Sequence, residues 1–153
     1  QVKLYNNLKK KILIIGFGNI GFRHAQSLLK NNYLIYIVDP SSKYFRKILK
    51  ETSKKNIFCF NDLKMIEEKK FDLMISATTA DKRFKTTLSA LKKFTIKNII
   101  FEKVVFTKKI EFSKMQIILK KNHIKSWVNC PLRNMLIGNF LLDSHHQVSP
   151  SFK

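Results

Sequence analysis

Three of the four glycines in this 153-residue chain lie within six positions, at Gly16, Gly18 and Gly21. They follow the apolar run 11–15 and precede a helical pattern, and a strand, a glycine turn and a helix in this order bind the pyrophosphate of a dinucleotide. The first glycine permits the tight turn, the second lets the main chain approach a phosphate, and the third lets the helix lie close to the strand. The free N–H groups of the helix start, here those of Asn19 and Ile20, then face the anion. The predicted phosphate-binding turn consists of Gly16, Phe17, Gly18, Asn19, Ile20 and Gly21.

An acidic residue follows the next apolar run. Residues 33–38 are apolar and end in Asp39, 18 residues after Gly21. A carboxylate at the tip of a second strand accepts hydrogen bonds from the ribose hydroxyls of NAD and repels the additional phosphate of NADP. Lys43 and Arg46 lie nearby and would soften that preference, so we predict NAD as the cofactor, with NADP as the alternative. The competing interpretation is a coincidental glycine turn followed by a strand that ends in Asp.

The net charge of +20 suggests a nucleic-acid-binding protein. Lysine outnumbers arginine 26 to 4, however, and the lysines are scattered along all segments. Nucleic-acid surfaces typically use arginine for bidentate contacts. We therefore interpret the charge as a solvated lysine-rich surface that attracts polyanions without specificity, and we expect no specific nucleic-acid partner.

The remaining composition favours an ordinary intracellular domain. No apolar stretch reaches the length of a membrane span and no leader pattern is visible, so we expect no membrane partner. Cys59 lies in an apolar run and is predicted to be a buried thiol, and neither Cys59 nor Cys130 has a CxxC partner. We therefore expect no metal site and a cytoplasmic location.

Strand and helix patterns alternate along the chain. The expected strands cover 11–16, 33–38, 57–60, 72–78, 98–101 and 125–129. The expected helices cover about 19–31 and 44–54, a segment that starts at Asp81, and 108–121. A further helix is expected after a cap at Asn61 or Asp62, and it carries Leu63, Ile66 and Glu67–Glu68. In the last helix the inward residues are expected to be Phe112, Met115, Ile118 and Leu119. Right-handed crossovers between such units give an α/β fold with a doubly wound, mainly parallel sheet of about six strands, a single three-layer Rossmann domain. We assign it residues 1–135, and we interpret 136–153 as the remnant of a domain junction with a disordered tail.

Four motifs in this order resemble the Gfo/Idh/MocA oxidoreductases, the group of glucose–fructose oxidoreductase and inositol dehydrogenase. His24 completes the family's GxGxxGxxH opening, and residues 75–79 (ISATT) resemble its "ATP" or "ATT" strand tip. Residues 99–103 (IIFEK) resemble its "EKP" signature, and residues 127–129 (WVN) followed by Arg133 resemble its "VN…R" segment. The combination spans about residues 11–135 and is more specific than the glycine turn alone.

The resemblance implies an NAD(P)-binding domain that precedes a larger substrate domain, and hydride transfer on a sugar, cyclitol or nucleotide-sugar. It places Thr78, Thr79 and Glu102 beside the cofactor. It also makes Lys103 a catalytic residue near the nicotinamide, where a lysine can stabilise developing negative charge on the reacting hydroxyl. The competing interpretation of Glu102–Lys103 is an exposed charge pair at a strand end. His24 either reaches the cofactor or caps the packing of helix against sheet.

The chain departs from the family pattern at several places. Val104 replaces the signature proline, and Arg83 stands where the family often has histidine, so that it either meets an anion or lies on the surface. Only about 20 residues follow where a substrate domain would begin, so we predict a chain that binds NAD(H) but is inactive alone. The alternatives are a noncatalytic NAD(H) sensor or scaffold and, from the charge, a nucleic-acid-binding protein. The apolar residues of the tail predict a severed junction or a homo-oligomer contact, namely Leu136, Ile137, Phe140, Leu141 and Leu142. The cluster of Asp143, His145 and His146 mimics an acid–base pair, binds a metal or belongs to a flexible tail.

Overall fold

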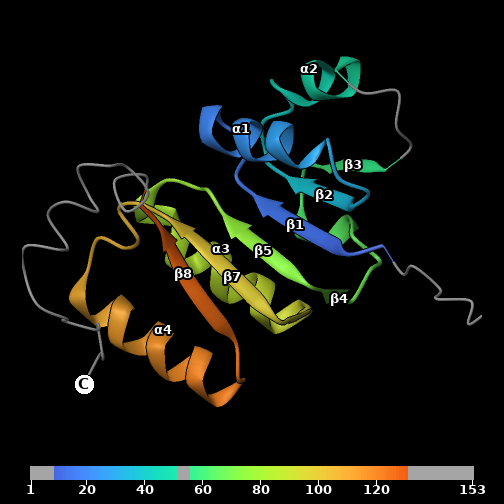
Figure 1. Cartoon of the computed structure of the whole chain (residues 1–153). Coiled ribbons are helices and arrows are strands. Elements are labelled where there is room, and N and C mark those ends of the chain that lie inside the picture. Colours follow the sequence, from blue (N-terminus) through green and yellow to red (C-terminus); the bar gives the residue numbers. More distant parts are fainter. Residues whose placement is uncertain (1–8, 52–55, 131–153) are drawn as a thin grey trace, which may run out of the picture.

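A six-stranded parallel sheet forms the centre of the molecule (Figure 1). The computed structural model describes residues 9–51 and 56–130, and the strand order is β3-β2-β1-β5-β7-β8. The strands of this sheet are β1 (Lys11–Ile15), β2 (Leu34–Val38), β3 (Ile57–Phe60), β5 (Leu73–Ser76), β7 (Asn98–Glu102) and β8 (Lys125–Asn129). The helices are α1 (Asn19–Leu28), α2 (Phe45–Lys50), α3 (Ala80–Lys93) and α4 (Lys109–Lys121).

Helices cover both faces of the sheet, which confirms the predicted doubly wound, three-layer fold (Figure 1). On one face, alternate residues of the strands such as Ile14 and Ile37 pack against α1 and α2 through Phe22 and Ile48. The other face packs against α3 and α4, with Met115 in its core. The central strand β1 is apolar from Ile12 to Ile15 because both of its faces are buried there.

All neighbouring strand pairs of the large sheet are parallel, so their carboxyl ends meet at one edge. Gly16 follows β1 at this edge, Asp39 follows β2, and Thr78 lies just beyond β5. Glu102 ends β7 and Asn129 ends β8. Ligands of open α/β sheets bind at this edge, at the point where the strand order reverses. Here that point is between β1 and β5.

The prediction of a helix after Asn61 or Asp62 is wrong. Asp62 does act as a cap and accepts a hydrogen bond from the Lys64 amide at 2.7 Å, but only a 3-10 turn follows, η1 (Leu63–Met65). The carboxylate of Glu68 explains the break, because it binds the Lys11 ammonium and two successive main-chain amides, at 69 and 70. These contacts hold the chain out of a helix and lead it into β4 (Lys70–Phe71).

A second, two-stranded parallel sheet was not predicted. It pairs β4 with β6 (Thr95–Ile96) at the start of the β5 and β7 units. Strands of two residues are too short to show a period in sequence. The small sheet buries Phe71 and Ile96 in the core that α3 and α4 cover.

Several element boundaries and burial predictions differ in detail. Helix α1 ends at Leu28 rather than near residue 31, and α2 covers only Phe45–Lys50 of the predicted 44–54. The side chain of Phe112, predicted to face inward, is 46% exposed. Cys59 is half-buried rather than fully buried, and burial raises its pKa to about 11.

Some predictions concern residues outside the described part of the chain. They include the junction remnant and tail at 136–153, the arginine at Arg133 and the histidine pair at His145 and His146. Among residues 9–51 and 56–130, no helix has both the length and the apolar composition needed to cross a membrane.

Candidate functional site

The glycine turn between β1 and α1 is packed on two sides and open on the third. Gly16 has a φ of +89°, and a Cβ on it would lie 2.5 Å from the main-chain nitrogen of Thr78. A Cβ on Gly21 would lie 2.0 Å from the carbonyl oxygen of Gly16. A Cβ on Gly18, by contrast, would meet nothing within 4 Å. The structure therefore confirms the tight turn at Gly16 and the close helix packing at Gly21, and it leaves room for a ligand at Gly18.

Main-chain donors line the open side of the turn. Helix α1 begins after Gly18, which forms no side-chain cap. Within the described segments, the N–H groups of Asn19 and Ile20 donate to no protein atom. Unpaired amides at a helix N-terminus and the helix dipole together attract an anion. This geometry fits the pyrophosphate of a dinucleotide.

Asp39 lies beside the turn and is already partly bound to the main chain. Its Oδ2 accepts the N–H of Phe17 at 2.6 Å, and its Oδ1 accepts the N–H of Ser41 at 2.7 Å. A carboxylate has about four lone-pair sites, so about two remain for ribose hydroxyls. The first contact also fixes Asp39 next to the glycine turn.

Phe17 does not line the open side of the turn. Its side chain is 1% exposed, and its ring packs 5.8 Å from that of Phe22 and 6.0 Å from that of Phe45. Its N–H is taken by Asp39. Phe17 therefore anchors the turn from inside, and the predicted contact of this residue with the cofactor would have to use its remaining main-chain atoms.

Thr78 and Thr79 lie at the tip that follows β5. The hydroxyl of Thr78 lies 3.3 Å from that of Thr86, and Thr79 is exposed at the start of α3. A hydrogen bond from Thr79 lowers the pKa of the Asp81 carboxyl. Because Gly16 lies directly against this tip, the two threonines border the phosphate-binding turn on the β5 side.

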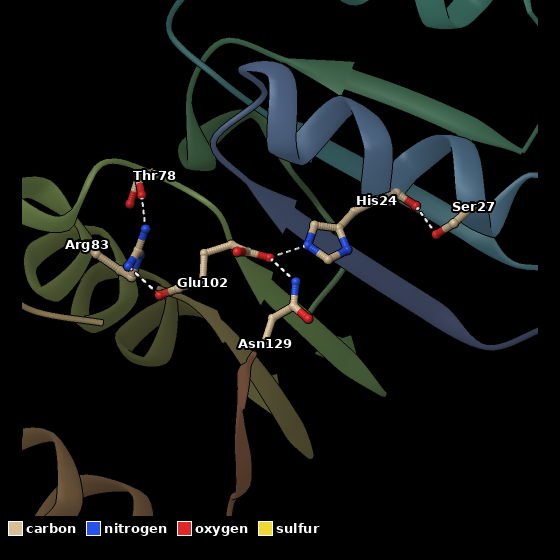
Figure 2. A network of polar contacts seen from close by, with 6 residues as sticks. All are labelled: His24, Ser27, Thr78, Arg83, Glu102 and Asn129. Carbon is tan, nitrogen blue, oxygen red and sulfur yellow. Dashed lines mark hydrogen bonds and ion pairs between the residues drawn. The ribbon is translucent and has the colours of Figure 1, made fainter. Parts of the chain in front are cut away.

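A buried carboxylate joins three elements at the end of β7 (Figure 2). Glu102 is 7% exposed, and its Oε1 lies 2.5 Å from Nε2 of His24 and accepts Nδ2 of Asn129 at 2.7 Å. His24 comes from α1 and Asn129 from β8, so the contact connects elements that are far apart in the sequence. Of the two interpretations of His24, the structure supports the one that ties helix to sheet. The partners of Glu102 could not be predicted, because His and Asn have many other uses.

Lys103 follows Glu102 but takes no part in this network. Its side chain is exposed, and in the described parts of the chain its ammonium takes part in no ion pair. Val104, which replaces the family proline, is 68% exposed. The ammonium of Lys103 is therefore available to a ligand, and its catalytic role stays a prediction.

Arg83 is not a surface residue, and no carboxylate of residues 9–51 and 56–130 forms an ion pair with it. Arg83 lies on the first turn of α3 and is 3% exposed. Its guanidinium donates hydrogen bonds to the main-chain carbonyl of Thr78, beyond β5, and to that of Glu102, at the end of β7 (Figure 2). Burial lowers its pKa, an effect that the charge of Glu102 opposes. The surface interpretation of Arg83 was wrong, because a carbonyl cluster of this kind leaves no mark in the sequence, and its contact with an anion stays a prediction.

Two hollows of the described surface lie away from these tips. One is lined by Tyr36, Phe60, Met65 and the segment 67–70. The other lies near Leu28, Leu73 and Trp127. Neither contains a predicted cofactor-binding residue, so the candidate site is the open carboxyl edge itself.

The glycine turn, the acidic tip of β2 and the parallel sheet together define an NAD-binding Rossmann domain. The family described as oxidoreductases with an NAD-binding Rossmann fold matches residues 10–130. The chain therefore belongs to the Gfo/Idh/MocA oxidoreductase family, as the four motifs predicted. NAD as the cofactor of this fold is confirmed by the same match. No curated protein sequence matches the chain.

Solved structures of dehydrogenases share the fold at low sequence identity. UDP-N-acetylglucosamine 3-dehydrogenase from Acidithiobacillus ferrooxidans is 15% identical, with a TM-score of 0.73 over 91% of this chain and 42% of that one. The WlbA dehydrogenase from Chromobacterium violaceum, in complex with NADH and UDP-GlcNAcA, is 16% identical, with a TM-score of 0.69 over 84% of this chain and 37% of that one. Scyllo-inositol dehydrogenase from Lactobacillus casei, with NAD(H) and scyllo-inositol, is 16% identical, with a TM-score of 0.71 over 87% and 39%. The chain thus spans about two fifths of the length of these structures.

Proposed function

We propose that this chain is the NAD(H)-binding part of a dehydrogenase that acts on a sugar, a cyclitol or a nucleotide-sugar. The observation that carries the proposal is the open turn at Gly18, where the unpaired amides of Asn19 and Ile20 lie beside the carboxylate of Asp39. The family supports the oxidation–reduction chemistry. The solved dehydrogenases named above support the substrate class, because their ligands or names include inositols and nucleotide-sugars.

We assign each residue of the carboxyl edge a role toward the cofactor. The amides at the start of α1 hold the pyrophosphate, and Asp39 holds the adenosine ribose. Thr78, Thr79 and Glu102 border the nicotinamide half. When bound, NAD supplies the hydride acceptor. Lys103 donates a hydrogen bond to the reacting hydroxyl of the substrate and stabilises the negative charge that develops there.

These 153 residues alone bind the cofactor but transfer no hydride to a sugar. The chain spans about two fifths of the length of the dehydrogenases of this fold, and Lys103 lines neither the hollow at Tyr36 nor the one at Trp127. Turnover of inositol or a nucleotide-sugar by this polypeptide would contradict this part of the proposal.

Calorimetric titration with NADH and NADPH tests the assignment of Asp39. We expect NADH to bind more tightly than NADPH, because the Asp39 carboxylate accepts ribose hydroxyls and repels a ribose phosphate. The Asp39→Ala variant should weaken NADH binding about tenfold and narrow the difference between the two nucleotides. Glu67→Ala is the matched control, since it removes one exposed carboxylate near the opposite edge of the sheet.

Two outcomes would contradict the proposal. One is a wild-type chain whose melting temperature does not change at saturating NADH. The other is an Asp39→Ala variant that binds both nucleotides like the Glu67→Ala control. The second outcome would leave nucleotide binding intact but would remove Asp39 from the site.

A further inference from the structure

One buried guanidinium bridges two tips of the sheet. The Arg83 side chain donates through Nη1 to the carbonyl of Glu102 at 2.5 Å and to that of Val105 at 3.2 Å, and also to the carbonyl of Val104. Its Nη2 donates to the carbonyl of Thr78. The first three carbonyls belong to the segment that leaves β7, and the fourth belongs to the segment that leaves β5.

Arginine is suited to this arrangement by its shape. Its guanidinium is planar, stays charged and carries five N–H donors in a fixed fork, whereas lysine offers one compact ammonium. In the described chain no carboxylate forms an ion pair with Arg83, and its Nε has no hydrogen-bond partner. A buried charge without a carboxylate is costly unless dipoles compensate for it. The four carbonyls supply that compensation, so the side chain and the two tips hold one another in place.

The carbonyl cluster encloses the main chain of Lys103. The carbonyls of Glu102 and Val104, on either side of Lys103, both accept hydrogen bonds from Arg83. The Glu102 side chain is held separately by His24 and Asn129. The main chain at Lys103 is therefore fixed from both sides while its side chain extends into solvent.

We propose that Arg83 is a positioning residue that fixes Lys103 and Thr78 relative to each other at the nicotinamide end of the site. This inference rests on the proposed function, because it assumes that the two tips contact the nicotinamide half of the cofactor. A guanidinium that only stabilised the fold would affect both halves of the cofactor site equally. Among the described residues the Arg83 guanidinium donates hydrogen bonds only to the β5 and β7 tips, so we expect its effect to be largest in the nicotinamide half.

Two ligands separate the halves of the site. NADH carries the nicotinamide, whereas ADP-ribose has the adenosine, the pyrophosphate and the second ribose without it. In the Arg83→Lys variant we expect NADH affinity to fall about tenfold and ADP-ribose affinity to stay unchanged. Arg23→Lys, an exposed arginine on α1, is the matched control and should bind both ligands like the wild type.

Hydrogen–deuterium exchange without ligand tests the positioning directly. Arg83 binds the carbonyl of Glu102 at the end of β7, so we expect the paired amides at 100–102 to exchange as slowly in the wild type as those of the neighbouring strands. In Arg83→Lys the amides at 100–102 should exchange about tenfold faster, while α1 and β1 stay unchanged. Should Arg83→Lys fail to fold, Arg83→Gln and the wild-type exchange pattern remain as tests.

The outcomes distinguish this proposal from the one on which it rests. If the wild type binds neither NADH nor ADP-ribose, the proposed function fails and this inference fails with it. If the wild type binds both, the inference alone is overturned by equal losses of the two ligands in Arg83→Lys, or by unchanged affinities. Fast exchange of the amides at 100–102 in the wild type would also overturn it.

Discussion

The two halves of the sheet build their parts of the carboxyl edge in different ways. The half that contains β1, α1 and β2 uses the main chain: glycines make room, and the amides of Asn19 and Ile20 are the donors. The half that contains β5, β7 and β8 uses long-range side-chain contacts. There Arg83 holds carbonyls, and Glu102 binds a histidine and an asparagine from other elements.

The difference teaches which kind of site can be read from a sequence. A main-chain site demands glycine at fixed spacings, because no other residue tolerates the turn and the close packing, so the requirement appears in the sequence. A side-chain site is assembled by the fold. His24 and Glu102 are 78 residues apart, and nothing near either residue indicates the other.

The largest expected effect separates two glycines of the same turn. Gly21→Ala should destabilise the protein by about 3 kcal/mol, because the new Cβ would lie 2.0 Å from the Gly16 carbonyl oxygen. Gly18→Ala should leave thermal stability nearly unchanged, since its Cβ meets nothing within 4 Å. The same Gly18 change should weaken NADH binding about tenfold by obstructing the approach of the phosphate. Thermal unfolding and NADH titration of both variants check this pair. Equal melting temperatures for the two would refute the packing assigned to Gly21.

A smaller effect is expected where side chains build the edge. Glu102→Ala should destabilise the protein by about 2 kcal/mol, because it removes a buried carboxylate and leaves the partly buried side chains of His24 and Asn129 without their acceptor. Chemical denaturation measures the change, and Glu67→Ala serves as the exposed control with an expected change near zero. A Glu102→Ala variant as stable as that control would show that the network contributes nothing to the fold.

The smallest effect concerns the opposite edge, where Asp72 joins the halves. Its carboxylate accepts the Lys97 ammonium at 2.7 Å and the Lys11 amide at 3.0 Å, and these contacts lower its pKa below 3.8. A lowered pKa in the folded state contributes stability above the unfolded value, and that contribution is lost as the pH falls through the folded value. Asp72→Asn should therefore destabilise by about 1 kcal/mol or less at pH 7, because the group is partly exposed. Denaturation from pH 7 to pH 3 should show this difference shrinking toward the acid end; a difference that grows there would be the opposite of what the contacts imply.

Most of the fold was predictable because apolar periods and turn residues carry it. The six strands of the large sheet stand where their patterns placed them, and Asp39 ends the second one. The helix after Asp62 failed because the contact of Glu68 with Lys11, 57 residues away, overrides local helical spacing. The strands β4 and β6 are too short to show a period.

The candidate site likewise contains residues that the sequence identified and contacts that it did not reveal. The glycine turn and Asp39 were identified from spacing, and Lys103 from resemblance to a family. The burial of Arg83 was missed, since its acceptors are main-chain carbonyls that any sequence possesses. Spacing along the chain cannot indicate a contact made to the backbone of a distant loop.

The unequal surroundings of the three glycines bear on how such domains diverge. Gly16 and Gly21 are enclosed by protein main chain, so selection for a folded molecule preserves them even in a descendant that has lost its nucleotide. A Cβ on Gly18 would meet no atom within 4 Å, so only the ligand requires glycine at this position. Among distant descendants of this domain that no longer bind the nucleotide, we therefore expect Gly18 to be replaced before Gly16 and Gly21.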